Sequence, residues 1–225
     1  TWQQVEQSRA LAGDSSCKAF EKDLSRFIGI DAGCVHLMPS GHQGLEWLLR
    51  SRLGSRRRVM VPAFNCGVVQ DAVTSAGLDS QLYDFSLKPG VFDWERVIDD
   101  ITPDVGVLIV THYFGVPIDF RPVIEYRVAR GITIIEDCAH TLGGTVDGHQ
   151  VGTLADAAIF SFNYDKPISL GWGGVAVINN ASVFDATQLS GHQVPQVEEE
   201  MVLLRQFVSA MAERRKRIAY QNRLS

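Results

Sequence analysis

Short apolar segments alternate with helical patterns along most of this chain, and this alternation restricts the fold more than any other feature. Most of the apolar segments are continuous rather than alternating with polar residues, which is typical of strands covered on both faces. With a short strand near His36–Met38, the pattern predicts an α/β domain with a mostly parallel, seven-stranded sheet sandwiched by helices. The other predicted strands are Val59–Pro62, Gln81–Phe85, Val105–Val110, Ile132–Ile135, Ala157–Phe162 and Val175–Ile178.

Glycine, proline and aspartate mark the ends of the predicted helices. Gly77 ends a helix that follows the second strand, and Gly131 ends one that Pro122 begins. Asp93 caps a helix that carries Val97, Ile98 and Ile101 and stops at Pro103.

The strand pattern stops at about Asp185, and two stretches that look helical follow, Val197–Met211 and Ala212–Leu224. We therefore expect one large domain over residues 1–184 and a helical segment over residues 185–225 that leads out of it. The chain begins at Thr1 without a methionine, which suggests a trimmed chain or a fragment.

Composition excludes several classes of partner. The formal net charge is −5, which argues against a nucleic-acid surface, and the basic cluster Arg214–Arg217 fits the solvated face of a helix. The four cysteines are scattered without a C-x-x-C pair, as expected in a reducing compartment. No leader peptide or membrane-spanning run stands out. We expect a cytoplasmic protein that contacts neither membrane nor nucleic acid.

The candidate site residues follow the predicted strands. Open α/β sheets bind ligands outside the carboxyl ends of their strands, so polar groups in those loops are the first candidates. The loops concerned are Ser40–Gly44, Phe64–Cys66, His112–Gly115, Glu136–His140 and Ser161–Lys166.

Asp137 ends an otherwise apolar strand, where an ionised carboxylate needs a cationic partner. A protonated pyridine nitrogen meets that need, and so does a helix cap or an arginine. Three residues on, His140 is placed to hydrogen-bond a ring oxygen beside that nitrogen, although a lone histidine is more often structural. Asp137 and His140 are therefore candidate cofactor ligands.

Lys166 lies in a glycine-rich loop between two apolar strands. Its amine suits Schiff-base formation and proton transfer, and the alternative is an ordinary surface lysine. Ser40 precedes a helix that carries Leu45, Leu48 and Leu49, and a helix N-terminus is a ready anion site. Ser161, five residues before Lys166, offers a hydroxyl to the same anion. Together these groups match a phosphate-bearing aldehyde cofactor.

The order of these pieces resembles the DegT/DnrJ/EryC1/StrS family of sugar aminotransferases, pyridoxal-phosphate (PLP) enzymes of fold type I. The resemblance extends from Ala19–Leu24 to Arg214–Leu224, nearly the whole chain. The shared motifs are S-G-x-x-x-L at Ser40–Leu45, V-P-A-F at Val61–Phe64, H-Y-F-G at His112–Gly115, E-D-C-A-H-T-L-G at Glu136–Gly143 and S-F-x-x-x-K-x-x-x-x-G-x-G-G at Ser161–Gly174.

The resemblance assigns roles to these residues. It implies that Lys166 forms the Schiff base with PLP, that Asp137 pairs with the pyridinium nitrogen, and that His140 neighbours the phenolic oxygen. Ser161 and the loop that carries Gly41, His42 and Gln43 bind the phosphate, and Cys66 lies over the open face of the ring. Lysine rather than histidine at position 166 indicates amino transfer rather than dehydration.

We therefore expect a homodimeric aminotransferase that moves an amino group, with glutamate as the donor, to a keto-sugar nucleotide. Aromatic residues on the predicted site loops support the dimer, unless they pack within one subunit: Phe64, Tyr113, Phe114, Tyr164 and Trp172. The family continues into a small C-terminal domain that this chain does not contain.

The sequence departs from the family at the site. Cys66 stands where many members have an aromatic residue, His42-Gln43 where they have Thr-Ala, Trp172 where they have glutamate, and His140 where glutamine is more usual. These changes affect the expected substrate more than the expected cofactor.

Other functions fit less well. The chain lacks the G-x-G-x-x-G of a nicotinamide oxidoreductase and the G-x-S-x-G of a serine hydrolase. A zinc site from Cys138, His140 and His149 has the wrong spacing, and we expect no metal. A truncated or silent relative, kept as a binding or regulatory module, is the remaining alternative; the absent small domain favours it, and the intact Asp137 and Lys166 oppose it.

Overall fold

The computed structural model describes residues 14–84 and 92–189. Residue Phe85 at the end of one predicted strand, and both helices predicted within 197–224, lie outside these ranges. None of the helices in the described part is long and apolar enough to cross a bilayer.

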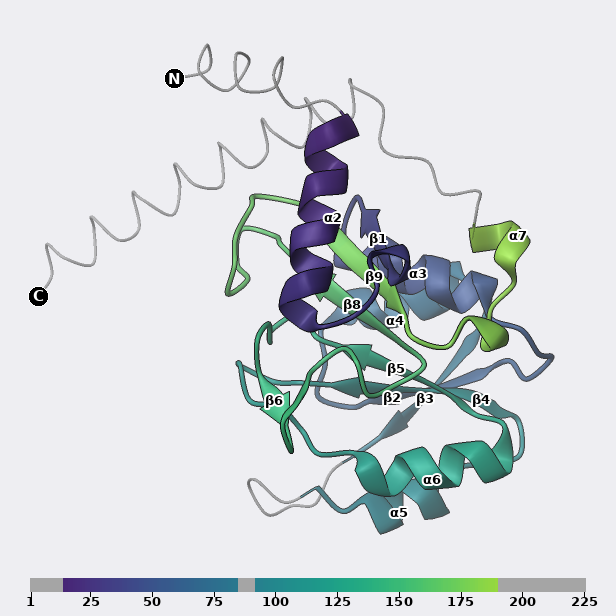
Figure 1. Ribbon diagram of the computed structural model, residues 1–225. Coiled ribbons are helices and arrows are strands. Elements are labelled where there is room, and N and C mark those ends of the chain that lie inside the picture. Colours follow the sequence, from purple (N-terminus) through teal and green to yellow (C-terminus); the bar gives the residue numbers. More distant parts are fainter. Residues whose placement is uncertain (1–13, 85–91, 190–225) are drawn as a thin grey trace, which may run out of the picture.

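A seven-stranded sheet forms the centre of the fold, as predicted (Figure 1). Its spatial order is β1-β9-β8-β5-β4-β2-β3. All neighbouring strands from β8 to β3 run parallel, whereas β9 is antiparallel to both β8 and β1. The strands are β1 (Val35–Met38), β2 (Arg58–Pro62), β3 (Asp79–Tyr83), β4 (Val105–Thr111), β5 (Thr133–Asp137), β8 (Ala157–Ser161) and β9 (Gly174–Ile178).

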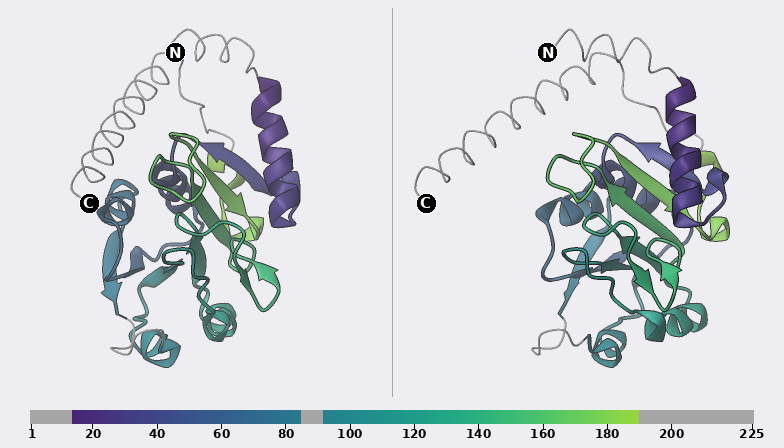
Figure 2. Two further views of the ribbon diagram at one scale, coloured as in Figure 1. Left: turned by 90° about the vertical axis from the view of Figure 1, so that its left-hand side faces the viewer. Right: turned by 60° about the vertical axis from the view of Figure 1, so that its left-hand side comes forward.

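Helices cover both faces of the sheet because most strands are apolar on both sides (Figure 2). On one face, α3 (Gly41–Ser51) and α4 (Gly67–Ser75) pack on a core that includes Leu45, Val69 and Ile135. On the other face, α5 (Trp94–Asp99) and α6 (Arg121–Arg130) cover the half of the sheet around β4. Helix α2 (Asp14–Ile28) covers the half around β9 on that same face.

Most predicted helix ends are confirmed. Gly131 follows α6 with a left-handed φ of 62°, and the Asp93 side chain accepts the Arg96 amide at the start of α5. Helix α5 nevertheless ends at Asp99, short of the predicted Pro103, because the amides of Asp100 and Ile101 already bond in a closing turn.

The apolar segment predicted for β5, Ile132–Ile135, stops two residues short of the strand, which ends at Asp137, the residue that we expected at its end. Glu136 and Asp137 belong to the strand although both are acidic and buried. Each is held by hydrogen bonds that a hydrophobic pattern cannot reveal. A short hairpin of β6 (Thr145–Val146) with β7 (His149–Gln150) was also not predicted, because two-residue strands leave no periodicity. Two short 3-10 turns, η1 (Ala32–Cys34) and η2 (Ala181–Val183), and α7 (Ala186–Leu189) complete the described elements.

Candidate active site

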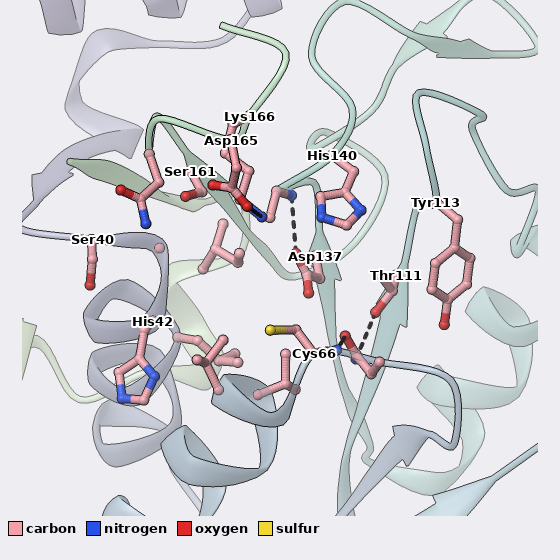
Figure 3. A pocket seen from close by; sticks show the side chains of 18 of the residues that line it. Ser40, His42, Cys66, Thr111, Tyr113, Asp137, His140, Ser161, Asp165 and Lys166 are labelled. Carbon is pink, nitrogen blue, oxygen red and sulfur yellow. Dashed lines mark hydrogen bonds and ion pairs between the residues drawn. The ribbon is translucent and has the colours of Figure 1, made fainter. Parts of the chain in front are cut away.

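One pocket of about 420 Å³ opens at the carboxyl ends of the parallel strands (Figure 3). Its size lies in the range of small-molecule sites, and its position is the one expected for an open α/β sheet. Seven of the eight predicted site residues line it. The lining comprises Ser40, Gly41, His42, Leu45, Phe64, Asn65, Cys66, Val68, Val69, Thr111, Tyr113, Phe114, Asp137, Ala139, His140, Ile159, Ser161, Asn163, Asp165 and Lys166.

Asp137 lies at the floor of the pocket. It is the last residue of β5, directly opposite Thr111 of β4 in the parallel register. Its carboxylate accepts the Ala139 amide at 3.0 Å, and its burial raises its pKa, against the effects of that hydrogen bond and of His140 and Lys166. A buried carboxylate of this kind gains most from a cationic partner supplied by a ligand.

Lys166 reaches the pocket from the loop after β8. Hydrogen bonds close the base of this loop: the Lys166 amide donates to the Asn163 carbonyl and the Phe162 amide to the Gly173 carbonyl. The lysine side chain is only 13% exposed, and its Nζ lies 3.6 Å from the Asp165 carboxylate. A lysine held in this way is directed into the pocket rather than into solvent, which argues against an ordinary surface role.

His140 stacks against Phe114, with ring centroids 5.9 Å apart and an angle of 24° between the planes. Its Nδ1 is buried and has no hydrogen-bond partner among the described residues. Phe114 itself takes a left-handed φ of 53°, a strained conformation that often marks a functional site. The imidazole therefore lies against Phe114 at the pocket, and its Nδ1 is available to a ligand.

The N-terminus of α3 forms one corner of the pocket and is the candidate anion-binding corner. The first amides of a helix have no acceptor within it, and the Ser40 Oγ accepts only the Gln43 amide, at 3.1 Å. Gly41 and His42 line the pocket, with Ser161 so close that a Cβ on Gly41 would lie 3.0 Å from the Ser161 Cβ. Gln43 does not line the pocket, so of the three predicted phosphate-loop residues Gly41, His42 and Gln43 only the first two line the site.

The wall opposite Lys166 comes from the loop after β2. Cys66 precedes α4, and the Asn65 side chain both accepts the Cys66 amide at 2.8 Å and donates to the Thr111 hydroxyl at 3.1 Å. The Tyr113 hydroxyl donates to the Phe64 carbonyl at 2.6 Å. These bonds fix the loop that places the Cys66 thiol toward the centre of the pocket (Figure 3).

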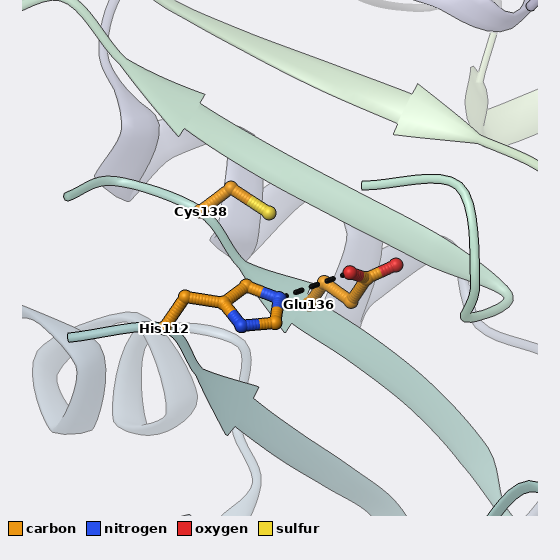
Figure 4. Close-up of side chains that lie close together, drawn as sticks. All are labelled: His112, Glu136 and Cys138. Carbon is orange, nitrogen blue, oxygen red and sulfur yellow. Dashed lines mark hydrogen bonds and ion pairs between the residues drawn. The ribbon is translucent and has the colours of Figure 1, made fainter. Parts of the chain in front are cut away.

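Sequence reasoning missed several polar lining residues, above all Thr111, Asn163 and Asp165. Thr111 ends an apolar strand just as Asp137 does, and that shared feature was the available signal. The zinc set of Cys138, His140 and His149 is not assembled. Among the described residues, Cys138 instead lies with His112 and Glu136 on the other side of β5 (Figure 4).

The residues present fit PLP. The α3 N-terminus and Ser161 match a phosphate, the buried Asp137 matches a pyridinium nitrogen, and the unpartnered His140 Nδ1 matches a ring substituent that carries a hydrogen-bonding oxygen. Lys166 supplies an amine for the aldehyde. This set of donors and acceptors, one for each polar group of the cofactor, would not be expected of a general anion site.

The fold is that of a fold type I PLP-dependent transferase. The chain belongs to the DegT/DnrJ/EryC1/StrS aminotransferase family, whose model matches residues 1–217. The cofactor of this family is PLP. The predicted family, fold class and cofactor are thereby confirmed.

Three relatives illustrate the match. A UDP-4-amino-4,6-dideoxy-N-acetyl-beta-L-altrosamine transaminase of Campylobacter jejuni is 26% identical over 80% of this chain and 48% of its own. Protein MosB of Rhizobium meliloti is 39% identical over 73% of this chain and 32% of its own. The structure of 3-amino-5-hydroxybenzoic acid synthase has a TM-score of 0.69 and 25% identity, over 79% of this chain and 45% of that one. The chain thus spans less than half the length of each.

Proposed function

We propose that this chain forms the catalytic core of an aminotransferase that moves an amino group from glutamate to a keto-sugar nucleotide in amino-sugar or polysaccharide biosynthesis. The carrying observation is that Asp137, the last residue of β5, and Lys166, on the loop after β8, line one pocket together with the N-terminus of α3. The named sugar transaminases among the relatives support the substrate class. A cytoplasmic location belongs to the same proposal.

The cofactor would be held at its two ends by this chain. The amides of Gly41 and His42 and the Ser161 hydroxyl would bind its phosphate, and the Asp137 carboxylate would keep its ring nitrogen protonated. His140 would donate or accept at the ring oxygen through its available Nδ1. When bound, PLP supplies an electron-withdrawing ring that stabilises negative charge on the carbon that loses a proton.

Lys166 would have two tasks. It would hold the cofactor covalently through Nζ, and once displaced by a substrate amine it would move a proton at the substrate carbon next to the nitrogen. Asp165, 3.6 Å from Nζ, offers that displaced amine a nearby partner. Leu45, Val69 and Ile159 give the pocket an apolar wall.

Reductive trapping tests the proposal. The purified protein with PLP should be yellow, and borohydride reduction followed by peptide mapping should place the pyridoxyl group on Lys166. Lys166→Arg should lose the label, whereas Lys18→Arg, on α2, should keep it. A label on another lysine, or no visible chromophore, rejects the assignment. Labelled protein that exchanges no amino group with glutamate would instead be a cofactor-binding module.

We also propose that two copies of the chain form the working unit. Phe64, Phe114 and Tyr164 are 63%, 75% and 42% exposed beside the pocket, and Ile168 and Leu170 extend this apolar surface. Tyr113 and Trp172 are partly buried, so they contribute less to it than the sequence suggested. A surface of this kind is more typical of an interface than of a monomer.

Light scattering tests the dimer. The wild-type protein with PLP should show twice the chain mass at micromolar concentration, and Leu170→Ser should weaken this association. Val128→Ser is the matched control, because Val128 is similarly exposed but lies on α6. A monomeric wild-type mass, or equal effects of both substitutions, rejects the proposal.

A further inference from the structure

A second polar cluster lies behind the floor of the pocket, on the opposite face of the sheet (Figure 4). It contains His112 and Glu136, whose side chains are completely buried, with His112 Nε2 3.0 Å from a Glu136 carboxylate oxygen. A buried carboxylate is costly unless it is fully hydrogen-bonded. This one also accepts the amides of Gly152 at 2.8 Å, Leu154 at 2.9 Å and Ala155 at 3.0 Å.

The hydrogen-bond partners fix the proton on the His112 ring. Its Nδ1 accepts the Ile118 amide at 2.9 Å, so the ring hydrogen is on Nε2 and points to Glu136. All four partners of the Glu136 carboxylate are therefore donors. Cys138 Sγ lies close enough to complete a set of metal ligands, but both ring nitrogens and both carboxylate oxygens are already engaged. The cluster is a hydrogen-bond network rather than a metal site.

Strand geometry connects this network to the active site. Successive side chains of a strand point to opposite faces, so Asp137 faces the pocket while Glu136 faces the network. On β4 the same alternation sends Thr111 to the pocket and places His112, just beyond the strand, in the network. The His112 amide also donates to the Asp137 carbonyl at 3.0 Å. This hydrogen bond joins the backbone after β4 to the end of β5, at the residue whose carboxylate lies in the pocket.

We propose that Glu136 and His112 are positioning residues for the cofactor site. Glu136 anchors the His112 ring to the 152–155 segment, and His112 in turn fixes the backbone of Asp137 and the start of the loop that carries Tyr113 and Phe114. The floor of the pocket at Asp137 and the loop with Tyr113 and Phe114 are thereby positioned by two residues on the opposite face of the sheet. Neither of these two residues contacts a ligand. This inference rests on the proposed function, because it concerns the site at which PLP would bind.

Two substitutions break this link in different ways. Glu136→Gln replaces one carboxylate oxygen by an amide NH2 group where four N–H donors converge. At least one of these donors then faces another donor instead of an acceptor. His112→Asn keeps an oxygen near the position of Nδ1 for the Ile118 amide, but removes the donor to Glu136. Asp156→Asn is the matched control. Asp156 is a buried carboxylate bonded to Ile134, Arg127 and Asn180, and it has no contact with His112.

The experiment measures PLP affinity and the absorption spectrum of the bound cofactor in the full chain, together with the melting temperature of each variant. Glu136→Gln and His112→Asn should weaken PLP binding about tenfold or more, as expected for a lost hydrogen bond to a charged group, and should shift the absorption band. Asp156→Asn should lower the melting temperature comparably and leave affinity and spectrum close to wild type.

Two results overturn the assignment. One is a PLP affinity that falls no further in Glu136→Gln than in Asp156→Asn, when the melting temperatures of the two variants have dropped by similar amounts. The other is stoichiometric zinc in the purified protein that disappears in Cys138→Ser. If Glu136→Gln does not fold, the milder His112→Asn decides by the same comparison. A wild-type protein that binds no PLP rejects the proposed function itself, and this assignment with it.

Discussion

Gly174, at the start of β9, lies against the backbone of Gly41, at the start of α3. A Cβ atom on Gly174 would be 2.3 Å from the Gly41 amide nitrogen and 2.5 Å from the Ser40 carbonyl carbon. No side chain fits there unless the backbone moves. The contact therefore sets the position of the helix N-terminus that forms the anion-binding corner of the pocket.

Gly174→Ala should consequently weaken PLP binding and lower the free energy of unfolding by about 1–3 kcal/mol, the usual cost of overpacking. The measurements are urea denaturation and PLP titration. Gly67→Ala is the control, because a Cβ on Gly67 would have no atom within 4 Å. Equal PLP affinity in Gly174→Ala and wild type would show that the helix position does not set the site.

Asp137→Asn should change the pH dependence of stability in the cofactor-free protein. Burial raises the pKa of Asp137 above 3.8, so the folded state is penalised once the carboxylate ionises. The neutral Asp137 side chain contributes its full stability at pH values below 3.8. This contribution is lost as pH rises through the higher pKa of the folded state. Each tenfold change in the protonation equilibrium corresponds to about 1.4 kcal/mol.

Asp137→Asn should therefore gain stability over wild type as pH rises above 3.8 and through the higher folded-state pKa of Asp137, measured by denaturation at fixed ionic strength. Asp104→Asn, at an exposed position paired with Arg58, should not show this gain. A stability difference between Asp137→Asn and wild type that is constant with pH would contradict the predicted sign.

The same Asp137→Asn variant should lose most of its half-reaction with glutamate, by about a hundredfold or more, because the ring nitrogen loses its charged partner. Stopped-flow spectroscopy of the PLP-loaded protein measures the rate. An amino-transfer rate within a few-fold of wild type would remove Asp137 from the mechanism.

Alkylation of cysteine offers a test of where the cofactor binds. Cys66 lines the pocket and Cys17 lies on α2, and both are exposed. PLP should protect Cys66 from iodoacetamide while Cys17 reacts at an unchanged rate, as followed by mass spectrometry of the peptides. Equal labelling of Cys66 with and without PLP would mean that the cofactor binds elsewhere.

The sequence by itself determined the class of fold, placed the strand ends to within two residues and singled out Lys166 and Asp137 as candidates for the site. The local signals were continuous apolar strands, glycine and proline at helix ends, and polar residues after strands. Each of these signals comes from residues that are near one another along the chain. The motif with Lys166 and the motif with Asp137 were recognisable because their residues are close in sequence.

Only the tertiary structure decided which of these residues line one pocket and which residues support that pocket from the opposite face of the sheet. Gln43 belongs to the predicted loop, but the Gln43 amide donates to the Ser40 hydroxyl that caps α3 and so does not face the pocket. Glu136 and Asp137 are neighbours in sequence but face opposite sides of the sheet, and the partners of Glu136 are up to 24 residues away along the chain. Strand pairing and the path of the 152–155 segment create those contacts, and no periodicity in the sequence encodes them.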